Sequence, residues 1–222
     1  MKKGKIIVIE GACDGIGKST QYNLLKEYLG SNVITHHFPS YDTMQGKGVE
    51  EYLSGKYGNI KDLSPYFVNN LDAYDRAITW KKDLEEKYNE GYTLLFDRYT
   101  TSSIIYQSCL IEDLEERKKF IDYIVDYEYN KLGIGKPDMV LFLEAPFELV
   151  TKLRNERKSN EGITNDIHEK DLDFMKKVYD NAIFVSNYLN WDKIECSDGS
   201  KFKNIEDIHN EILKKIEFIV NK

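Results

Sequence analysis

The fold of this chain is decided by the stretch Ile6-Ile7-Val8-Ile9-Glu10-Gly11-Ala12-Cys13-Asp14-Gly15-Ile16-Gly17-Lys18-Ser19-Thr20. An apolar run gives way to a glycine-rich turn that ends in Lys-Ser-Thr and opens onto a helical pattern, an order that predicts a strand, a phosphate-binding loop and a helix. Backbone N–H groups, the helix N-terminus and the Lys18 ammonium can all face a polyphosphate, and the Ser19 hydroxyl can hold Mg²⁺. A plain strand-to-helix turn is the alternative interpretation.

The spacing of the glycines departs by one residue from the usual motif. G-x-x-x-x-G-K-[ST], counted back from Lys18, needs its first glycine at position 12, but that residue is Ala12 and Gly11 comes one residue earlier. Either the loop has one extra residue or Ala12 takes the place of a glycine. The predicted set of residues that bind nucleotide phosphates is Gly11, Ala12, Cys13, Asp14, Gly15, Ile16, Gly17, Lys18, Ser19 and Thr20.

Length, charge and cysteine content narrow the class of protein. The 222 residues fit a single α/β domain, residues 1–222, with a sizeable core. A net charge of −7 argues against a nucleic-acid polymer as partner, because such polymers are bound by clustered Lys and Arg. The three cysteines lack metal-ligand spacing and are expected to be reduced; Cys13 is interpreted as a small loop residue, with sensitivity to oxidation as the alternative. We find no secretory leader or apolar run of membrane-spanning length, so no membrane partner and a cytoplasmic location are expected.

Other apolar runs predict a parallel sheet flanked by helices. A strand–helix–strand crossover of the length found here is right-handed and joins parallel strands. The loops at the carboxyl ends of such strands are expected to carry the ligand contacts. Strands are predicted at 33–38, 92–97, 139–144 and 191–196 in addition to the first. Helices are predicted at 20–29, 64–88, 112–132, 147–157 and 205–219, with a short helical piece at 49–53 and a helix that carries Phe174, Val178 and Tyr179.

Charged and polar side chains follow the strand at 92–97. Asp97 can orient Mg²⁺ through water, and Arg98 can bind a phosphoryl group through two parallel hydrogen bonds. A local salt bridge between these two residues is the alternative. In the next segment Ser103, Tyr106 and Gln107 are placed at helical spacing, so their side chains can hydrogen-bond the edge of a base and pack against a sugar.

A basic segment lies later in the chain. Arg154, Arg157 and Lys158 precede Ser159-Asn160-Glu161-Gly162, which is polar and has no apolar periodicity. This pattern predicts a lid at about 154–166 whose cations close over a triphosphate. The alternative is that the cations only stabilise the C-terminal end of a helix dipole.

Seven motifs, in order and with matching separations, resemble the thymidylate kinase family within the nucleoside monophosphate kinases. They are Gly11 to Thr20, Phe38-Pro39-Ser40-Tyr41, Pro65-Tyr66 through Asp75-Arg76, Asp97-Arg98-Tyr99, Ser102 to Gln107, Lys136-Pro137-Asp138, and Asp166 through Glu169. The resemblance covers nearly the whole chain. It implies a three-layer P-loop kinase fold with a parallel sheet of about five strands, transfer of the ATP γ-phosphoryl group to dTMP with Mg²⁺ to give dTDP, and a homodimer.

Catalytic and metal-binding roles follow from this resemblance by position. Lys18 would hold the β- and γ-phosphates, Arg98 the acceptor phosphate, and Ser19 and Asp97 the Mg²⁺ ion. In families of this type the catalytic arginine comes from the phosphate loop or from the lid. The loop here has Gly15, and the implied catalytic residues are therefore Lys18, Arg98, Arg154 and Arg157.

The resemblance also assigns the dTMP site. Asp14 would reach the sugar 3′-hydroxyl, Phe38 and Tyr41 would line the sugar and phosphate, and Arg76 would address the thymine O4. Ser103 would face the base, and Tyr106 would crowd the 2′ position and so disfavour ribonucleotides. The implied substrate-binding residues are Asp14, Phe38, Tyr41, Asp72, Arg76, Arg98, Ser103, Tyr106 and Gln107.

Asp72 is where this chain departs from the family pattern. These kinases usually have an aromatic ring, four residues before the arginine that reads the base, to stack on thymine. Tyr66, Phe67 or Tyr74 can supply a ring from elsewhere, or the carboxylate can accept a hydrogen bond from an amino group or pin Arg76. Three alternatives stay open: a kinase of another deoxynucleoside monophosphate or nucleoside, a nucleotide-binding protein with little turnover, and a structural domain without ligand.

Overall fold

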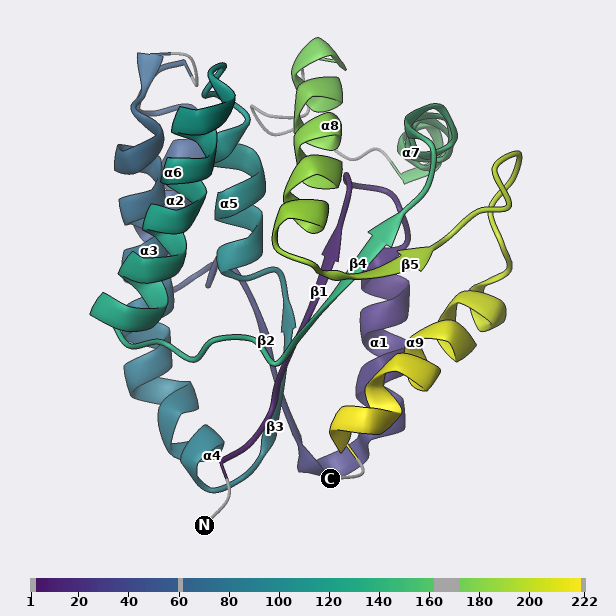
Figure 1. Ribbon diagram of the computed structural model, residues 1–222, viewed down its shortest axis with the longest axis horizontal. Helices are drawn as coiled ribbons and strands as arrows, with labels where there is room; N and C mark the ends of the chain where they lie inside the picture. Colours follow the sequence, from purple (N-terminus) through teal and green to yellow (C-terminus); the bar gives the residue numbers. More distant parts are fainter. Residues whose placement is uncertain (1–2, 60–61, 162–171, 221–222) are drawn as a thin grey trace.

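The strands of the chain form one parallel sheet. The structure is a computed structural model that describes residues 3–59, 62–161 and 172–220. Five strands pair in the order β2-β3-β1-β4-β5, which confirms the predicted sheet (Figure 1). Their bounds are β1 Ile6–Gly11, β2 Val33–His37, β3 Thr93–Asp97, β4 Met139–Glu144 and β5 Asp192–Glu195.

The first strand is the centre of the sheet. Every residue of β1 is buried, because β3 and β4 pair with it on either side and helices cover both of its faces. Val8, for example, is in register with Phe96 on one side and Val140 on the other. Strands buried on both faces have continuous apolar sequences, which is the pattern of residues 6–9.

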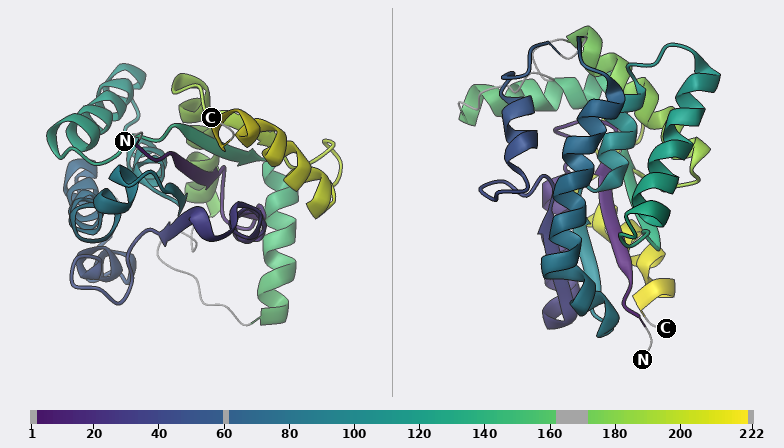
Figure 2. Two further views of the ribbon diagram at one scale, coloured as in Figure 1. Left: turned by 90° about the horizontal axis from the view of Figure 1, so that it is seen from below. Right: turned by 90° about the vertical axis from the view of Figure 1, so that its left-hand side faces the viewer.

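Helices cover both faces of the sheet (Figures 1 and 2). On one face α1 packs against α9, while on the other α5 packs against α3, α6 and α8. This arrangement confirms three layers. The helices are α1 Lys18–Leu29, α2 Lys47–Leu53, α3 Pro65–Thr79, α4 Glu85–Asn89, α5 Thr100–Ser108, α6 Leu114–Val125, α7 Phe147–Glu161, α8 Leu172–Tyr188 and α9 Ile205–Val220.

Two predicted helices contain wider turns than expected. The helix predicted at 64–88 is α3, a π-helical turn at Trp80–Leu84, and α4; the helix predicted at 112–132 is α6 followed by a π-helical turn at Asp126–Lys131. Periodicity over 3.6 residues does not register such a turn, which inserts one residue into the helix.

The helix α7 also ends later than predicted. It continues through Glu161, so residues 159–161 of the predicted polar segment are helical. Residues 162–166 of the predicted lid, and the motif at Asp166 and Glu169, lie outside the described residues. Within the described ranges, none of the helices combines the length and apolar character that a membrane crossing requires.

Candidate active site

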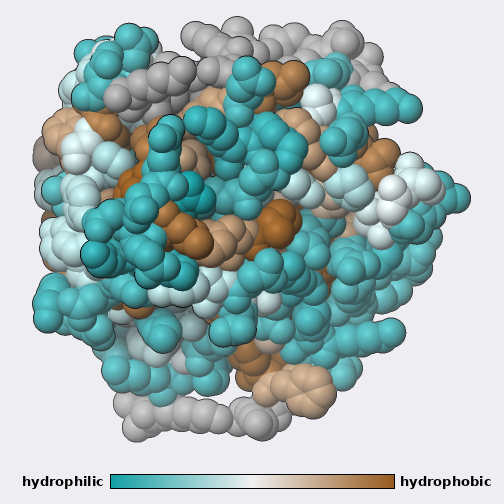
Figure 3. All heavy atoms as spheres, turned by 45° about the horizontal axis from the view of Figure 1, so that its top comes forward, coloured by the Kyte–Doolittle hydropathy of each residue, from teal (hydrophilic) through white to brown (hydrophobic). Residues whose placement is uncertain are grey.

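The carboxyl ends of the central strands bring the predicted site residues to one end of the sheet. β1 leads into the glycine-rich loop, β2 ends next to Phe38, and β3 ends at Asp97 with Arg98 directly after it. Figure 3 looks onto this end of the molecule, where apolar side chains lie among a mostly hydrophilic surface. Parallel α/β sheets bind their ligands at such a position.

The conformation of the glycine-rich loop accounts for its irregular spacing. A Cβ atom on Gly11 would lie 2.8 Å from Cγ2 of Ile16, so Gly11 occupies a position that favours glycine. Ala12 is fully buried, and its backbone N–H donates to the carbonyl of Leu143 at 3.0 Å. These contacts favour one extra residue in the loop over an alanine in the place of a glycine. Gly17, with φ +97°, then occupies the N-cap position before α1 in a backbone conformation that glycine adopts at no steric cost.

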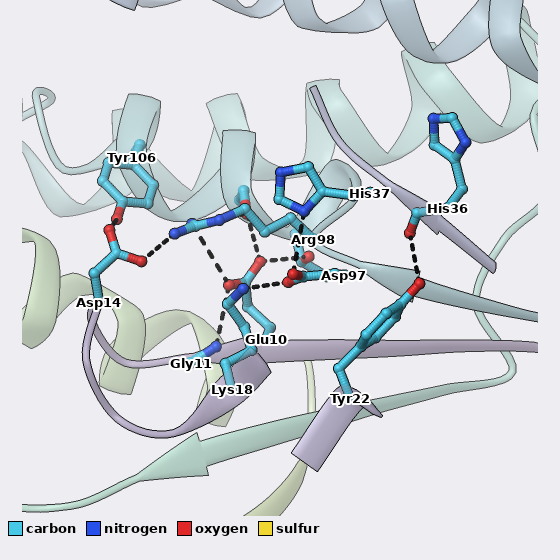
Figure 4. Close-up of polar contacts among 12 residues, drawn as sticks. Glu10, Gly11, Asp14, Lys18, Tyr22, His36, His37, Asp97, Arg98 and Tyr106 are labelled. Atoms are coloured by element: carbon cyan, nitrogen blue, oxygen red, sulfur yellow. Dashed lines mark hydrogen bonds and ion pairs between the residues drawn. The ribbon is translucent and has the colours of Figure 1, made fainter. Parts of the chain in front are cut away.

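Lys18 and His37 meet on the carboxylate of Asp97 (Figure 4). Lys18 Nζ forms an ion pair with Oδ1 of Asp97, and Nδ1 of His37 lies 3.1 Å from Oδ2. Burial alone would raise the pKa of Asp97, but the hydrogen bond from His37 and the charge of Lys18 together lower it. Asp97 is therefore ionised at neutral pH. This contact was not predicted from the sequence, because His37 lies 60 residues from Asp97.

Arg98 lies between the loop and the helix α5 (Figure 4). Its φ of +64° is in the left-handed region, and its guanidinium forms an ion pair with Asp14 and stacks over the ring of Tyr106 at 5.8 Å. Burial would raise the pKa of Asp14, but the positive charges of Arg98 and of the more distant Lys18 lower it. Because Asp97 pairs with Lys18 and Arg98 with Asp14, the alternative of a local Asp97–Arg98 salt bridge is wrong.

Glu10 is a buried carboxylate that the sequence interpretation missed. It accepts hydrogen bonds from the backbone N–H of Gly11 at 3.0 Å and from the hydroxyls of Thr101 and Ser102, and it lies 4.0 Å from Arg98. It thus joins the start of the loop to the start of α5. An acid at the end of an otherwise apolar strand was the available signal, since a carboxylate is buried only where partners satisfy it.

A cavity of about 250 Å³ opens beside Arg98, between α3 and α5. The structure brings all the predicted substrate-binding residues to its wall, together with His37, Pro39, Tyr52, Asp75, Tyr99 and others. The predicted residues that line it are Asp14, Phe38, Tyr41, Asp72, Arg76, Arg98, Ser103, Tyr106 and Gln107.

Arg76 is held at the inner end of this cavity by a second residue that the sequence interpretation missed. Glu128 is fully buried and binds Arg76 bidentately, with Nε–Oε2 and Nη2–Oε1 distances of 2.6 and 2.7 Å. Burial opposes the charge on Arg76, but Glu128 raises the pKa of the guanidinium beyond its usual value. Glu128 lies in the π-helical turn after α6 and 52 residues from Arg76, so no local spacing revealed the pair.

Asp72 lies one turn before Arg76 on α3. Its Oδ2 atom accepts a hydrogen bond from the hydroxyl of Ser103 at 2.9 Å, and burial raises its pKa to about 6. Arg76 is bound bidentately by Glu128, and the structure gives no hydrogen bond or ion pair between Asp72 and Arg76, so the interpretation that Asp72 pins Arg76 is wrong.

The other aromatic rings of α3 do not replace the missing stacking partner. Tyr66, Phe67 and Tyr74 are exposed by 46%, 43% and 54%, and they are not part of the cavity wall. Tyr66 packs instead against Phe120 and Tyr123 of α6. The rings that do line the cavity come from outside α3, chiefly Phe38 and Tyr106.

Arg154 is the basic residue that the structure brings to the loop. It is buried, and a Cβ atom on Gly15 would lie 3.1 Å from Cβ of Arg154, so the absence of a side chain at Gly15 makes room for α7. The guanidinium of Arg154 contacts Met175 of α8. Arg157 belongs to α7, but its side chain lies outside the described residues.

The cysteines are buried thiols. Cys13, Cys109 and Cys196 are free, and burial raises the pKa of each to about 12. A thiol reacts as the thiolate, so this shift favours the interpretation of Cys13 as a small loop residue over that of an oxidation-sensitive one. The described residues contain no cluster of three or more His, Cys, Asp or Glu side chains able to hold a metal ion by itself.

Known proteins share this architecture. The family model described as thymidylate kinase matches residues 9–212. A solved structure of the thymidylate kinase from Candida albicans, described as revealing the origin of its broad substrate specificity, is 26% identical; the match covers 97% of this chain and 92% of that one with a TM-score of 0.72. The thymidylate kinase structure from Ehrlichia chaffeensis, at 20% identity, covers 97% and 100% of the two chains with a TM-score of 0.67 and supports the same fold.

Proposed function

Because the chain belongs to the thymidylate kinase family and is an ATP-dependent nucleoside monophosphate kinase, we propose that it transfers the γ-phosphoryl group of ATP to dTMP, giving ADP and dTDP. One observation supports this above all. The glycine-rich loop and the cavity are adjacent, and Arg98 lies between them, paired with Asp14 of the loop and lining the cavity. A donor and an acceptor nucleotide can therefore meet in line at this arginine.

The donor phosphates are assigned to the loop. Its backbone N–H groups, the start of α1 at Lys18 and the ammonium of Lys18 supply positive potential to the β- and γ-phosphates. The Asp97 carboxylate and the Ser19 hydroxyl are oxygen donors of the kind Mg²⁺ prefers, and Mg²⁺ usually takes one or two protein oxygens besides phosphates and water. When bound, the ion would neutralise charge on the transferring group.

Arg98 is assigned to the acceptor phosphate. A guanidinium binds two phosphate oxygens with parallel hydrogen bonds, which positions the attacking oxygen and offsets the charge that spreads over the moving phosphoryl group. That oxygen forms the new bond to the γ-phosphorus while the bond to the β,γ-bridging oxygen breaks. A phosphate monoester is already deprotonated enough to attack, so no general base is assigned.

The sugar is assigned to Asp14 and Tyr106. The Tyr106 hydroxyl is 3.4 Å from Oδ2 of Asp14, so both side chains border the same part of the cavity. Asp14 then accepts from the 3′-hydroxyl, while the ring of Tyr106 leaves little room for a 2′-hydroxyl. Arg154 adds positive charge beside the loop, and we assign it in preference to Arg157 to the phosphates of ATP.

A coupled assay that records ADP release tests the proposed reaction. It would be run with dTMP, dUMP, dCMP, dGMP and thymidine as acceptors, and kcat/KM is expected to be highest for dTMP. Equal values across the panel would contradict the choice of dTMP, and ATP binding without ADP release would favour a nucleotide-binding protein with little turnover. Asp72 is the observation that favours another deoxynucleoside monophosphate as a second candidate, and the Candida albicans relative is described as broad in specificity.

We also propose a homodimer formed through α3 and α6. Tyr66, Phe67 and Tyr74 on α3 are exposed, as are Leu114 and Tyr123 on α6, and these two helices lie on the same side of the molecule (Figure 1). Large apolar side chains gathered on one face favour a protein partner. Light scattering is expected to give about twice the mass of one chain. The free cysteine thiols are consistent with a cytoplasmic location, which we retain as a proposal.

A further inference from the structure

The base end of the cavity contains a carboxylate that the proposed reaction does not use. Asp72 lines the cavity and makes one hydrogen bond with the described residues, through Oδ2 to Ser103. Its other oxygen, Oδ1, has no partner among the hydrogen bonds that the described residues form. The nearest cation is Arg76, whose charge is already matched by Glu128. A ligand that supplies an N–H group to Asp72 would satisfy this carboxylate.

The donors of Arg76 are nearly all used. Nε donates to Glu128, Nη2 donates to Glu128 and to Ser103 at 2.9 Å, and Nη1 makes one long contact of 3.5 Å with the carbonyl of Tyr99. A guanidinium has five N–H groups, so one N–H of Nη1 is left for a ligand after the bonds formed within the described chain. Ser103 accepts from Arg76 and donates to Asp72, which keeps this remaining donor and the carboxylate side by side.

A donor beside an acceptor is complementary to one particular edge of a base. In thymine and uracil the carbonyl O4 lies next to the ring N3–H, and O6 lies next to N1–H in guanine. Cytosine and adenine present the reverse order, an amino group next to a ring nitrogen that carries a lone pair. A carboxylate facing that lone pair would repel it, so the pair formed by Arg76 and Asp72 discriminates between the two classes of base.

We propose that Asp72 determines base specificity by accepting a hydrogen bond from the ring N–H of a lactam edge, while Arg76 donates to the neighbouring carbonyl. This inference rests on the proposed function, because it deepens the assignment of the acceptor cavity. It also explains why the position on α3 carries a carboxylate without an aromatic ring: the base is selected there by its hydrogen-bonding edge. Glu128 acts as a positioning residue for Arg76.

Gln107 is the competing acceptor. It also lines the cavity, it is buried, and its Oε1 atom has no hydrogen-bond partner in the part of the chain that the structure describes. We assign Asp72 to the N–H because Ser103 links it directly to Arg76, whereas Gln107 lies a helical turn further along α5. Variants of the two residues separate these assignments.

Binding of dTMP and of N3-methyl-dTMP, measured by calorimetry without ATP, tests the proposal. The methylated nucleotide lacks the N–H, so the wild-type protein is expected to bind it at least tenfold more weakly than dTMP. Asp72→Ala is expected to weaken dTMP binding about tenfold and to bring the ratio of the two dissociation constants close to one. The control Asp83→Ala removes an exposed carboxylate from the π-helical turn after α3 and should keep the wild-type ratio.

The proposal would be overturned if Asp72→Ala keeps the wild-type ratio, if Gln107→Leu alone abolishes it, or if the wild-type protein binds dCMP more tightly than dTMP. Asp72→Asn has the same shape and guards against loss of folding. Because the amide can present either an acceptor or a donor to the base, Asp72→Asn should reduce the preference for dTMP over dCMP about tenfold. An unchanged preference counts against Asp72. If the binding pattern is as expected but no ADP is released, the proposed function is contradicted and this inference is supported. If dTMP is turned over but Asp72→Ala keeps the wild-type ratio of dissociation constants, the proposed function is supported and this inference is contradicted.

Discussion

The two ends of the site are assembled in different ways. At the donor end, Lys18 and Ser19 begin α1 directly after the glycine-rich loop, and the positive φ angles of Gly15 and Gly17 set the path of the backbone into them. At the acceptor end, Asp72 comes from α3, Ser103 from α5 and Glu128 from the turn after α6. Most of the donor end is thus specified locally, with Asp97 of β3 as its distant member, whereas the acceptor end exists only when three distant segments pack together. Changes to the donor end should therefore affect catalysis, and changes to the acceptor end should affect both stability and the choice of base.

The largest effect is expected for Lys18→Ala. The variant removes the ammonium that faces the donor phosphates, so kcat should fall at least a thousandfold, equivalent to about 4 kcal/mol of activation free energy. The coupled ADP assay measures this loss. Lys26→Ala, on the exposed side of the same helix, is the control and should leave kcat unchanged. A rate for Lys18→Ala within about threefold of the wild type would refute the catalytic role of the loop.

Glu128→Gln should produce the largest loss of stability at the acceptor end. It leaves the buried guanidinium of Arg76 without its counter-charge, and breaking a buried pair in this way costs about 3 kcal/mol in the free energy of unfolding. Urea denaturation measures the change. Glu115→Gln removes an exposed carboxylate that pairs with Lys118 on the same helix, and it should cost less than about 0.5 kcal/mol. Equal losses in the two variants would mean that the Arg76–Glu128 pair does not hold the acceptor end together.

Gly15→Ala tests the contact between the loop and α7. The new Cβ atom would crowd Arg154, so kcat should fall about tenfold, which corresponds to about 1.4 kcal/mol of activation free energy. The substitution also strains the backbone, because Gly15 has a positive φ. Gly58→Ala is the matched control, because Gly58 has a similar φ of +98° and open space around it. It should show the strain in its stability and leave kcat as it is. A similar drop in kcat for both variants would remove the argument for Arg154.

A smaller effect is expected for the pH dependence of stability in Asp72→Asn. The folded-state pKa of Asp72, about 6, lies above the ordinary value of 3.8, so ionisation of Asp72 destabilises the folded state. That cost is absent below pH 4, grows between pH 4 and 6, and is fully present above pH 6. Asp72→Asn should therefore raise the free energy of unfolding relative to the wild type, and by about 1 kcal/mol more at pH 8 than at pH 5.

Urea titrations of the wild type and Asp72→Asn at pH 5 and pH 8 measure this difference. It should narrow at pH 5, because part of Asp72 is then protonated in the wild type. Asp83→Asn, at an exposed position, should show no such dependence. A difference in the free energy of unfolding that is the same at pH 5 and pH 8 would mean that ionisation of Asp72 does not destabilise the folded protein.

The same contrast explains how far the sequence alone could lead. The five strands, the glycine-rich loop and nine of the residues that line the cavity were predicted, because apolar runs and short motifs are local features of the chain. Glu10, His37 and Glu128 were missed as partners, since their contacts join residues far apart in sequence. The π-helical turn that brings Glu128 to Arg76 leaves no trace in helical periodicity, and the spacing of the loop was resolved only by the contact between Gly11 and Ile16.

A crystal structure with dTMP and a non-hydrolysable ATP analogue tests the division into donor and acceptor ends most directly. The account predicts the triphosphate in the loop at Lys18, the dTMP phosphate at Arg98, and the thymine N3 within hydrogen-bonding distance of Asp72 with O4 at Arg76. A base bound outside the cavity between α3 and α5, or a thymine whose N3 faces Gln107 while Asp72 makes no contact with it, would contradict it.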